Sequence, residues 1–79
     1  AHPQDARALS RRGEAYRQLG RDEEAVSDFA RVLAINPDDA WSLARRADVY
    51  RRMERYQEAL ADFVRAMAIT PDDAWGLAH

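Results

Sequence analysis

The chain has 79 residues, which limits it to one small domain with a modest core. Hydrophobic residues make up 47% of it and charged residues 33%, with a net charge of −2, and this balance is typical of a folded domain rather than a disordered one. There is no cysteine, which excludes disulfides, thiol nucleophiles and zinc sites built on thiolates, and no apolar run approaches the roughly 20 residues that span a bilayer.

Hydrophobic periodicity predicts an all-α chain. The expected helices lie at about 5–18, 22–35, 39–52 and 56–69, with a partial fifth helix from residue 73. The first, third and fifth of these begin with an aspartate, namely Asp5, Asp39 and Asp73. A short carboxylate at this place accepts the N–H groups that a first helical turn leaves unpaired, so each aspartate is a candidate N-cap.

The connections between the helices carry turn and stop signals. Gly20 follows the first helix and tolerates the left-handed backbone conformation that often ends a helix. Glu54 stands at the equivalent place after the third helix, so we expect a more strained turn there. Pro37 and Pro71 end the second and fourth helices, because proline disfavours helical geometry in the residue before it.

The chain repeats itself with a period of 34 residues. Residues 3–36 laid over 37–70 are identical at 16 of 34 positions without a gap, and residues 71–78 match 37–44 with one difference. Since a single helix pair cannot cover its own apolar face, each repeat should stack on its neighbour. The expected domain is 1–79, divided into repeats at about 6–39 and 40–73 and a partial repeat at 74–79.

Two matched sets of apolar and small residues mark the expected core. The first set lies on the first two helices and comprises Leu9, Gly13, Tyr16, Ala25, Val26, Phe29 and Leu33. The second set is its repeat: Leu43, Ala47, Tyr50, Ala59, Leu60, Phe63 and Met67. Gly13 and Ala47 are small because two helix backbones approach closely there. We expect Phe29 and Phe63 to be buried between the helix pairs.

These positions resemble the tetratricopeptide repeat pattern over nearly the whole chain. The matching residues are Leu9, Gly13, Tyr16, Ala25, Phe29 and Pro37, then Leu43, Ala47, Tyr50, Ala59, Phe63 and Pro71. The resemblance implies a right-handed α–α superhelix, a solenoid of antiparallel helix pairs whose first helices line a concave groove that holds a partner protein. The sequence departs from the family at Arg12 and Arg46, which replace a leucine. We expect their stems to lie on the core and their heads to reach water.

The face of the first helices that the resemblance places in the groove is rich in arginine and tryptophan. Its candidate partner-binding residues are Arg7, Arg11, Glu14, Arg17, Trp41, Arg45, Asp48, Arg51, Arg52 and Trp75. Forked hydrogen bonds from arginine hold carboxylates, and aromatic rings accept apolar side chains. We therefore expect the ligand to be an acidic or mixed acidic–apolar segment of another protein.

The same residues also permit a plainer interpretation. Glu14 and Asp48 stand three or four residues from arginines of their own helices, which is the spacing of solvated ion pairs worth a few tenths of a kcal/mol each. Trp41 is placed either to cover Arg45 one turn on or to pack at the junction between the repeats. On the second helices we expect a solvated convex surface made of Glu24, Asp28, Arg31, Glu58, Asp62 and Arg65.

Other classes of function have less support. His2 and His79 stand at the two ends, no glycine-rich phosphate loop is present, and paired aspartates fit helix caps better than metal ligands, so we expect no enzyme, cofactor or metal site. In related proteins a lysine and two asparagines clamp the C-terminal tail of chaperones. Ser10, Glu14 and Arg45 occupy three of the matching places, which argues against that ligand.

The remaining alternatives concern partners and context. A surplus of acidic residues and the 34-residue period argue against nucleic acid, so self-association through uncapped repeat ends, as a homo-oligomer, is the main alternative. Arrays of this kind usually need about three repeats, so we expect a fragment of a larger scaffold or regulatory protein. The chain shows no signal peptide and no cysteine, which favours the cytoplasm over a membrane or secreted location. All twelve basic residues are arginine, which indicates a GC-rich, bacterial genome.

Overall fold

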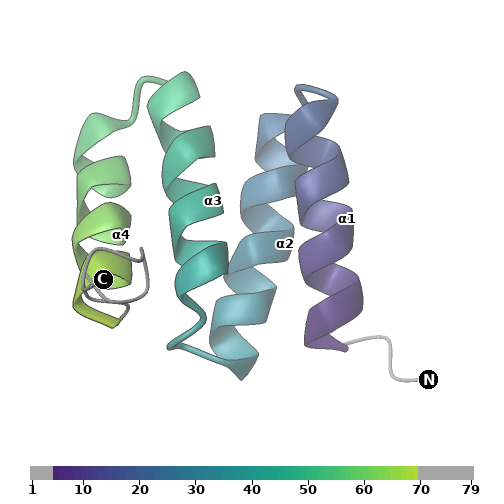
Figure 1. Cartoon of the computed structure of the whole chain (residues 1–79). Coiled ribbons are helices and arrows are strands. Elements are labelled where there is room, and N and C mark those ends of the chain that lie inside the picture. Colours follow the sequence, from purple (N-terminus) through teal and green to yellow (C-terminus); the bar gives the residue numbers. More distant parts are fainter. Residues whose placement is uncertain (1–4, 70–79) are drawn as a thin grey trace, which may run out of the picture.

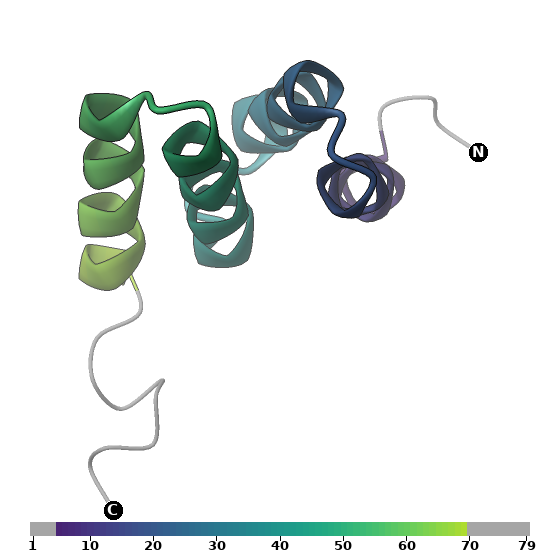
Figure 2. The same ribbon diagram turned by 90° about the horizontal axis from the view of Figure 1, so that it is seen from above.

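The computed structural model describes residues 5–69. They form four helices: α1 (Ala6–Gln18), α2 (Asp22–Ile35), α3 (Ala40–Arg52) and α4 (Tyr56–Ile69). The helices lie side by side in chain order, and neighbours run in opposite directions (Figure 1). Seen from above, α3 lies between α2 and α4 (Figure 2). The all-α prediction and the four helix ranges are confirmed to within one residue, whereas the fifth helix predicted from residue 73, including Trp75, falls outside the described residues.

Both predicted N-caps within the described residues are present. Asp5 has extended backbone geometry, and its Oδ1 accepts a hydrogen bond from the backbone N–H of Arg7 at 2.9 Å. Asp39 accepts two hydrogen bonds from Ser42, one from the backbone N–H at 3.3 Å and one from the hydroxyl at 3.0 Å. These caps satisfy donors that the first turns of α1 and α3 cannot pair internally.

The two turns inside the helix pairs have the same geometry but different residues. Gly20 adopts a φ of 79°, and Glu54 at the equivalent place adopts a φ of 64°. The next residue closes each turn: Arg21 N–H donates to the Tyr16 carbonyl, and Arg55 N–H donates to the Tyr50 carbonyl, both at 2.8 Å. The turn therefore requires a left-handed residue in both repeats, and only the first repeat supplies glycine.

Replacing Glu54 with glycine is expected to stabilise the chain by about 1 kcal/mol, because the left-handed conformation costs an L-residue roughly that much and glycine nothing. The gain is reduced somewhat because glycine also raises the entropy of the unfolded chain. Urea unfolding of the two chains measures it. The matched control is Gly20→Ala, which should be destabilising; a loss of stability in Glu54→Gly would contradict the explanation.

The core centres on the contact between α2 and α3. Ala25, Phe29 and Val49 are fully buried, and the side chains of Tyr16, Val26 and Met53 pack against them. Gly13 lies against the ring of Phe29: a Cβ at Gly13 would stand 3.0 Å from Phe29 Cε1, so the close approach predicted there is confirmed. Val49 was not among the predicted core residues, and its counterpart in the first repeat, Ala15, is exposed.

The expectation that both phenylalanines are buried is half wrong. Phe29 is 0% exposed, but Phe63 is 37% exposed. Phe29 is enclosed because α3 covers α2, and the ring of Trp41 packs edge-on against it with centroids 6.0 Å apart. The residue equivalent to Trp41 for Phe63 is Trp75, which lies outside the described residues.

The expectation that the heads of Arg12 and Arg46 are simply solvated is wrong: each guanidinium binds an aspartate, with the Arg12 side chain 53% exposed and that of Arg46 19% exposed. The guanidinium of Arg12 makes a forked contact with Asp28, with N–O distances of 2.7 and 2.9 Å, and Arg46 makes the same contact with Asp62 at 2.7 and 3.0 Å. Asp28 and Asp62 are buried, so the prediction that they belong to a solvated surface is also wrong. Each pair links the two helices of its own repeat, in place of the leucine packing of the family.

Candidate functional site

Nine of the ten predicted binding residues lie on α1 and α3, and Trp75 falls outside the described residues. Arg7 and Trp41 correspond to each other, as do Arg11 and Arg45. The two helices contact each other directly, and an ion pair between Arg17 Nη1 and Asp48 Oδ2, 2.9 Å long, joins them. This ion pair joins predicted residues of the first repeat to predicted residues of the second.

Four of these residues form a single chain of ion pairs. Arg17 donates to both carboxylate oxygens of Glu14 at 2.8 and 2.6 Å, and also to Asp48. Asp48 in turn accepts a hydrogen bond from Arg51 at 2.7 Å. The same-helix spacing does produce the Glu14–Arg17 and Asp48–Arg51 pairs, but the first is largely buried rather than solvated, with side chains 21% and 18% exposed, and the network also crosses between the repeats. We call Glu14, Arg17, Asp48 and Arg51 the ion-pair chain.

Arg52 makes a second contact between the repeats. Its guanidinium donates to the carboxylate of Asp22, at the start of α2, and to the backbone carbonyl of Arg17 at 2.9 Å. Predicted as a binding residue, Arg52 already has two partners, and Asp22 was not predicted at all. The sequence gives little indication that Asp22 joins the repeats, because the equivalent residue of the second repeat is Tyr56.

Trp41 both contacts Arg45 and packs at the junction between the repeats, so the two interpretations of this residue are both correct. The guanidinium of Arg45 lies over the indole of Trp41, 5.2 Å from the ring centroid, while the edge contact with Phe29 places Trp41 at the repeat junction. Trp41 nevertheless remains 44% exposed. Within residues 5–69, the Nε of Arg45 is buried without a hydrogen-bond acceptor.

Arg7 and Arg11 are exposed, and among the described residues neither side chain has a carboxylate partner. With Arg45 they are the cations of this surface that form no ion pair with a carboxylate of residues 5–69. We call Arg7, Arg11, Trp41 and Arg45 the arginine–tryptophan surface. It adjoins the ion-pair chain, since the charge of Arg45 acts on Glu14.

The carboxylates of the ion-pair chain have lowered pKa values. Hydrogen bonds from Arg17 hold the pKa of Glu14 below its ordinary 4.5, and a hydrogen bond from Arg51 holds the pKa of Asp48 below its ordinary 3.8. Burial acts in the opposite direction on both groups, but the arginine contacts prevail. The network therefore favours the ionised form of both side chains.

Acid is expected to destabilise the chain through this network. Because both pKa values are lower in the folded chain than in the unfolded one, the stabilisation is complete above about pH 5 and is lost as the pH falls through 4.5 and 3.8 toward the folded values. Urea unfolding measured from neutral pH down to about pH 3 tests this. The double variant Glu14→Gln, Asp48→Asn should be less stable at neutral pH and lose less on acidification; equal acid losses in both chains would contradict the role of these two groups.

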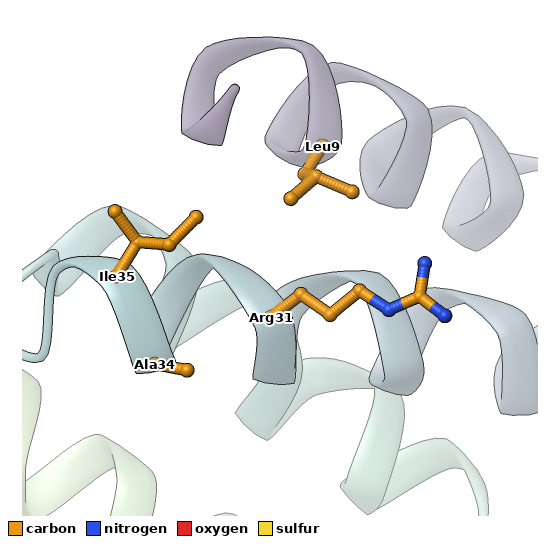
Figure 3. A pocket seen from close by; sticks show the side chains of 4 residues that line it. All are labelled: Leu9, Arg31, Ala34 and Ile35. Atoms are coloured by element: carbon orange, nitrogen blue, oxygen red, sulfur yellow. The ribbon is translucent and has the colours of Figure 1, made fainter. Parts of the chain in front are cut away.

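The cavities among the described residues are small. One of about 160 Å³ lies between α1 and α2, where Leu9 extends from α1 toward Arg31, Ala34 and Ile35 (Figure 3). Small-molecule sites usually enclose about 300–1,000 Å³, so this cavity is a packing gap rather than a ligand site. The part of the chain that the structure describes contains no cluster of metal-ligating side chains, and none of its helices has both the length and the apolar character needed to cross a membrane.

Comparison with known families agrees with this geometry. Two tetratricopeptide repeat family models match the chain, one over residues 6–39 and the other over residues 40–73. No individual curated protein matches it. The two matches together cover most of the sequence, and each contains one of the helix pairs, α1–α2 or α3–α4. The chain therefore belongs to the tetratricopeptide repeat family.

Proposed function

We propose that the arginine–tryptophan surface binds an acidic or mixed acidic–apolar segment of another protein. Tetratricopeptide repeats are generally protein–protein interaction modules. The observation that carries the proposal is that exposed Arg7 and Arg11 form no ion pair with a carboxylate of residues 5–69 and lie on the same face as Arg45 and the half-exposed Trp41. A ligand carboxylate would supply the acceptors that the described residues lack.

The chemistry of the surface divides between two kinds of contact. Arg7 and Arg11 offer forked donors that no carboxylate of the described residues occupies, and arginine pairs with carboxylates in two parallel hydrogen bonds. The open part of the Trp41 ring offers apolar area to a side chain that accompanies the acidic group. The ion-pair chain is assigned a different task, which is to fix α1 against α3 so that both halves of the surface keep their spacing.

The proposed function is binding alone, without catalysis. Repeats of this family are typically scaffolds without enzymatic activity, and both histidines of the chain stand outside the described helices. We therefore assign the surface no catalytic, cofactor or metal role and no nucleic-acid ligand. A titration with single-stranded RNA provides the check on the last point, since a phosphate ligand would lose affinity steeply as the salt concentration rises.

Selection from a displayed library of short random peptides is the test. We expect enrichment of sequences that combine aspartate or glutamate with an apolar residue. The double variant Arg11→Gln, Arg45→Gln should bind the selected peptides at least about tenfold more weakly, because it removes two charged donors without adding a repulsive charge. Trp41→Ala should weaken binding most for peptides with an aromatic or aliphatic residue.

The matched control is Arg31→Gln, Arg65→Gln, which removes the same charge from exposed positions on the second helices. This variant should keep wild-type affinity. If the two double variants lose affinity equally, the attraction is a general charge effect and the arginine–tryptophan surface is not the site. Enrichment of basic peptides would also overturn the proposal.

A further inference from the structure

We propose that copies of this chain stack head to tail, with α1 of one copy packing on α4 of the next as α3 packs on α2 within one chain. The inference goes beyond the proposed peptide binding and does not depend on it. It rests on α1 and α4, which form the two ends of the row of helices (Figure 1). Each end presents a face whose counterpart inside the chain is covered.

The open face of α4 is apolar. Its exposed large side chains are Tyr56, Leu60, Phe63, Val64 and Met67. The equivalent residues of α2 are Asp22, Val26, Phe29, Ala30 and Leu33, which are smaller at three of the five places although α3 covers that helix. An apolar face of this kind on a small domain marks an interaction site. α4 is therefore better suited to an apolar partner than α2 is.

The junction inside the chain shows what a partner helix must provide. From α3, Val49 fills the centre against Phe29, and Trp41 covers the edge of the same ring. In α1, the residues at those two places are Ala15 and Arg7, and both are exposed. An alanine opposite Phe63 leaves more room than a valine does.

A larger residue of α4 matches this extra room. Leu60 replaces Val26, which packs against the cluster that contains Val49 inside the chain, so this side chain on α4 is larger where the facing side chain on α1 is smaller. Close packing is best preserved when total volume is conserved across a junction. Leu19, exposed at 71%, stands on α1 where Met53 of α3 packs against the core inside the chain.

The charged residues also differ between the junction inside the chain and the proposed junction, and they differ in pairs. Inside the chain Arg52 pairs with Asp22; at the proposed junction the same places hold Gln18 and Tyr56, so both charges disappear together and neither is left buried alone. The other cross-repeat ion pair, between Arg17 and Asp48, has an arginine–carboxylate equivalent at the proposed junction. Its equivalent joins Arg51 of one copy to Glu14 of the next, and Arg51 is exposed enough to reach a further partner.

A second copy presenting α1 is thus the occupant that the described residues support. Pairing of two α4 faces would match apolar side chains but would leave α1 open, and it has no template inside the chain. A head-to-tail junction is heterologous, so it continues beyond a dimer instead of closing. It would also repeat the arginine–tryptophan surface along the stack.

Sedimentation equilibrium of the full chain from micromolar to millimolar concentration tests the proposal. The average mass of the wild type should rise past that of a dimer. Leu60→Glu blocks the α4 face and Ala15→Glu blocks the α1 face, so each variant alone should stay monomeric. An equimolar mixture of the two should form dimers, because one intact α4 face then meets one intact α1 face.

The control Ser27→Glu adds the same charge at an exposed position of α2 outside both faces and should associate like the wild type. All three positions are exposed, so circular dichroism should show unchanged helicity. A wild type that stays monomeric overturns the proposal, whether the α4 face remains open or the repeated segment 71–78 takes it. Association of Ala15→Glu alone, with Leu60→Glu monomeric, overturns it in favour of paired α4 faces.

Discussion

Replacing Phe29 with alanine is expected to leave the chain largely unfolded at room temperature. Phe29 is fully buried and contacts both α1, through Gly13, and α3, through Trp41. Truncation of a buried phenylalanine costs about 3–5 kcal/mol, which is comparable to what the core of so small a domain supplies. Thermal unfolding followed by circular dichroism measures the loss.

The repeat provides the control for this prediction. Phe63→Ala removes the same atoms from the equivalent place, but Phe63 is partly exposed, so its loss of stability should be clearly smaller. Equal losses at the two positions would mean that Phe63 is as well covered as Phe29. An unchanged melting temperature for Phe29→Ala would contradict the packing described around α2.

The second large effect is expected at Arg46. Its forked contact is the ion pair that the structure gives Asp62, a buried carboxylate, and Arg46 itself is mostly buried. Arg46→Met keeps the apolar stem but leaves the carboxylate without its charge partner, and breaking a buried pair in this way costs about 3 kcal/mol. Urea unfolding gives the difference.

Two further variants separate the ion pair from simple packing. Arg46→Met combined with Asp62→Leu should regain much of the lost stability, since a buried pair replaced by apolar residues is often neutral. Arg12→Met should cost less than Arg46→Met, because Asp28 retains Arg31 at 3.9 Å and Arg12 is half-exposed. A double variant as unstable as Arg46→Met would show that the helices need the arginine for another reason.

The helices were predictable because their signals are local. Aspartate caps, a left-handed turn residue and the 3.6-residue spacing of apolar side chains each act within a few residues, and they place all four helices. Burial is different, because it depends on a neighbour. Phe29 and Phe63 occupy equivalent places one repeat apart, yet only Phe29 has a described helix over it, so periodicity alone could not separate them.

The Arg12–Asp28 and Arg46–Asp62 pairs were missed for a related reason. Each residue, taken singly, fits an exposed helix position, and only the pairing of two helices brings the arginine and the aspartate together. A signal did exist: both residues recur unchanged in the two repeats, 16 residues apart each time. A polar pair kept at a constant separation across a repeat indicates a contact between the two helices of that repeat.

The candidate site stays a prediction, and the sequence did not show which of its residues join the two repeats. The ten residues were selected for lying on one face, which treats every arginine alike. The structure separates Arg17 and Arg52, which join the repeats, from Arg7 and Arg11, which have no carboxylate partner among the described residues. That distinction depends on distances between helices and could not come from spacing along one of them.

The position of α3 has a consequence for how the chain opens. α3 packs against each of the other three helices, and Val49, Leu43 and Arg52 all lie on it. A fluctuation that lifts α4 away leaves the α1–α2–α3 contacts in place, but one that displaces α3 removes the cover of Phe29 and both cross-repeat ion pairs at once. Backbone amides of α4 should therefore exchange with deuterated solvent through partial opening, whereas those in the middle of α2 and α3 should exchange only when the whole domain unfolds.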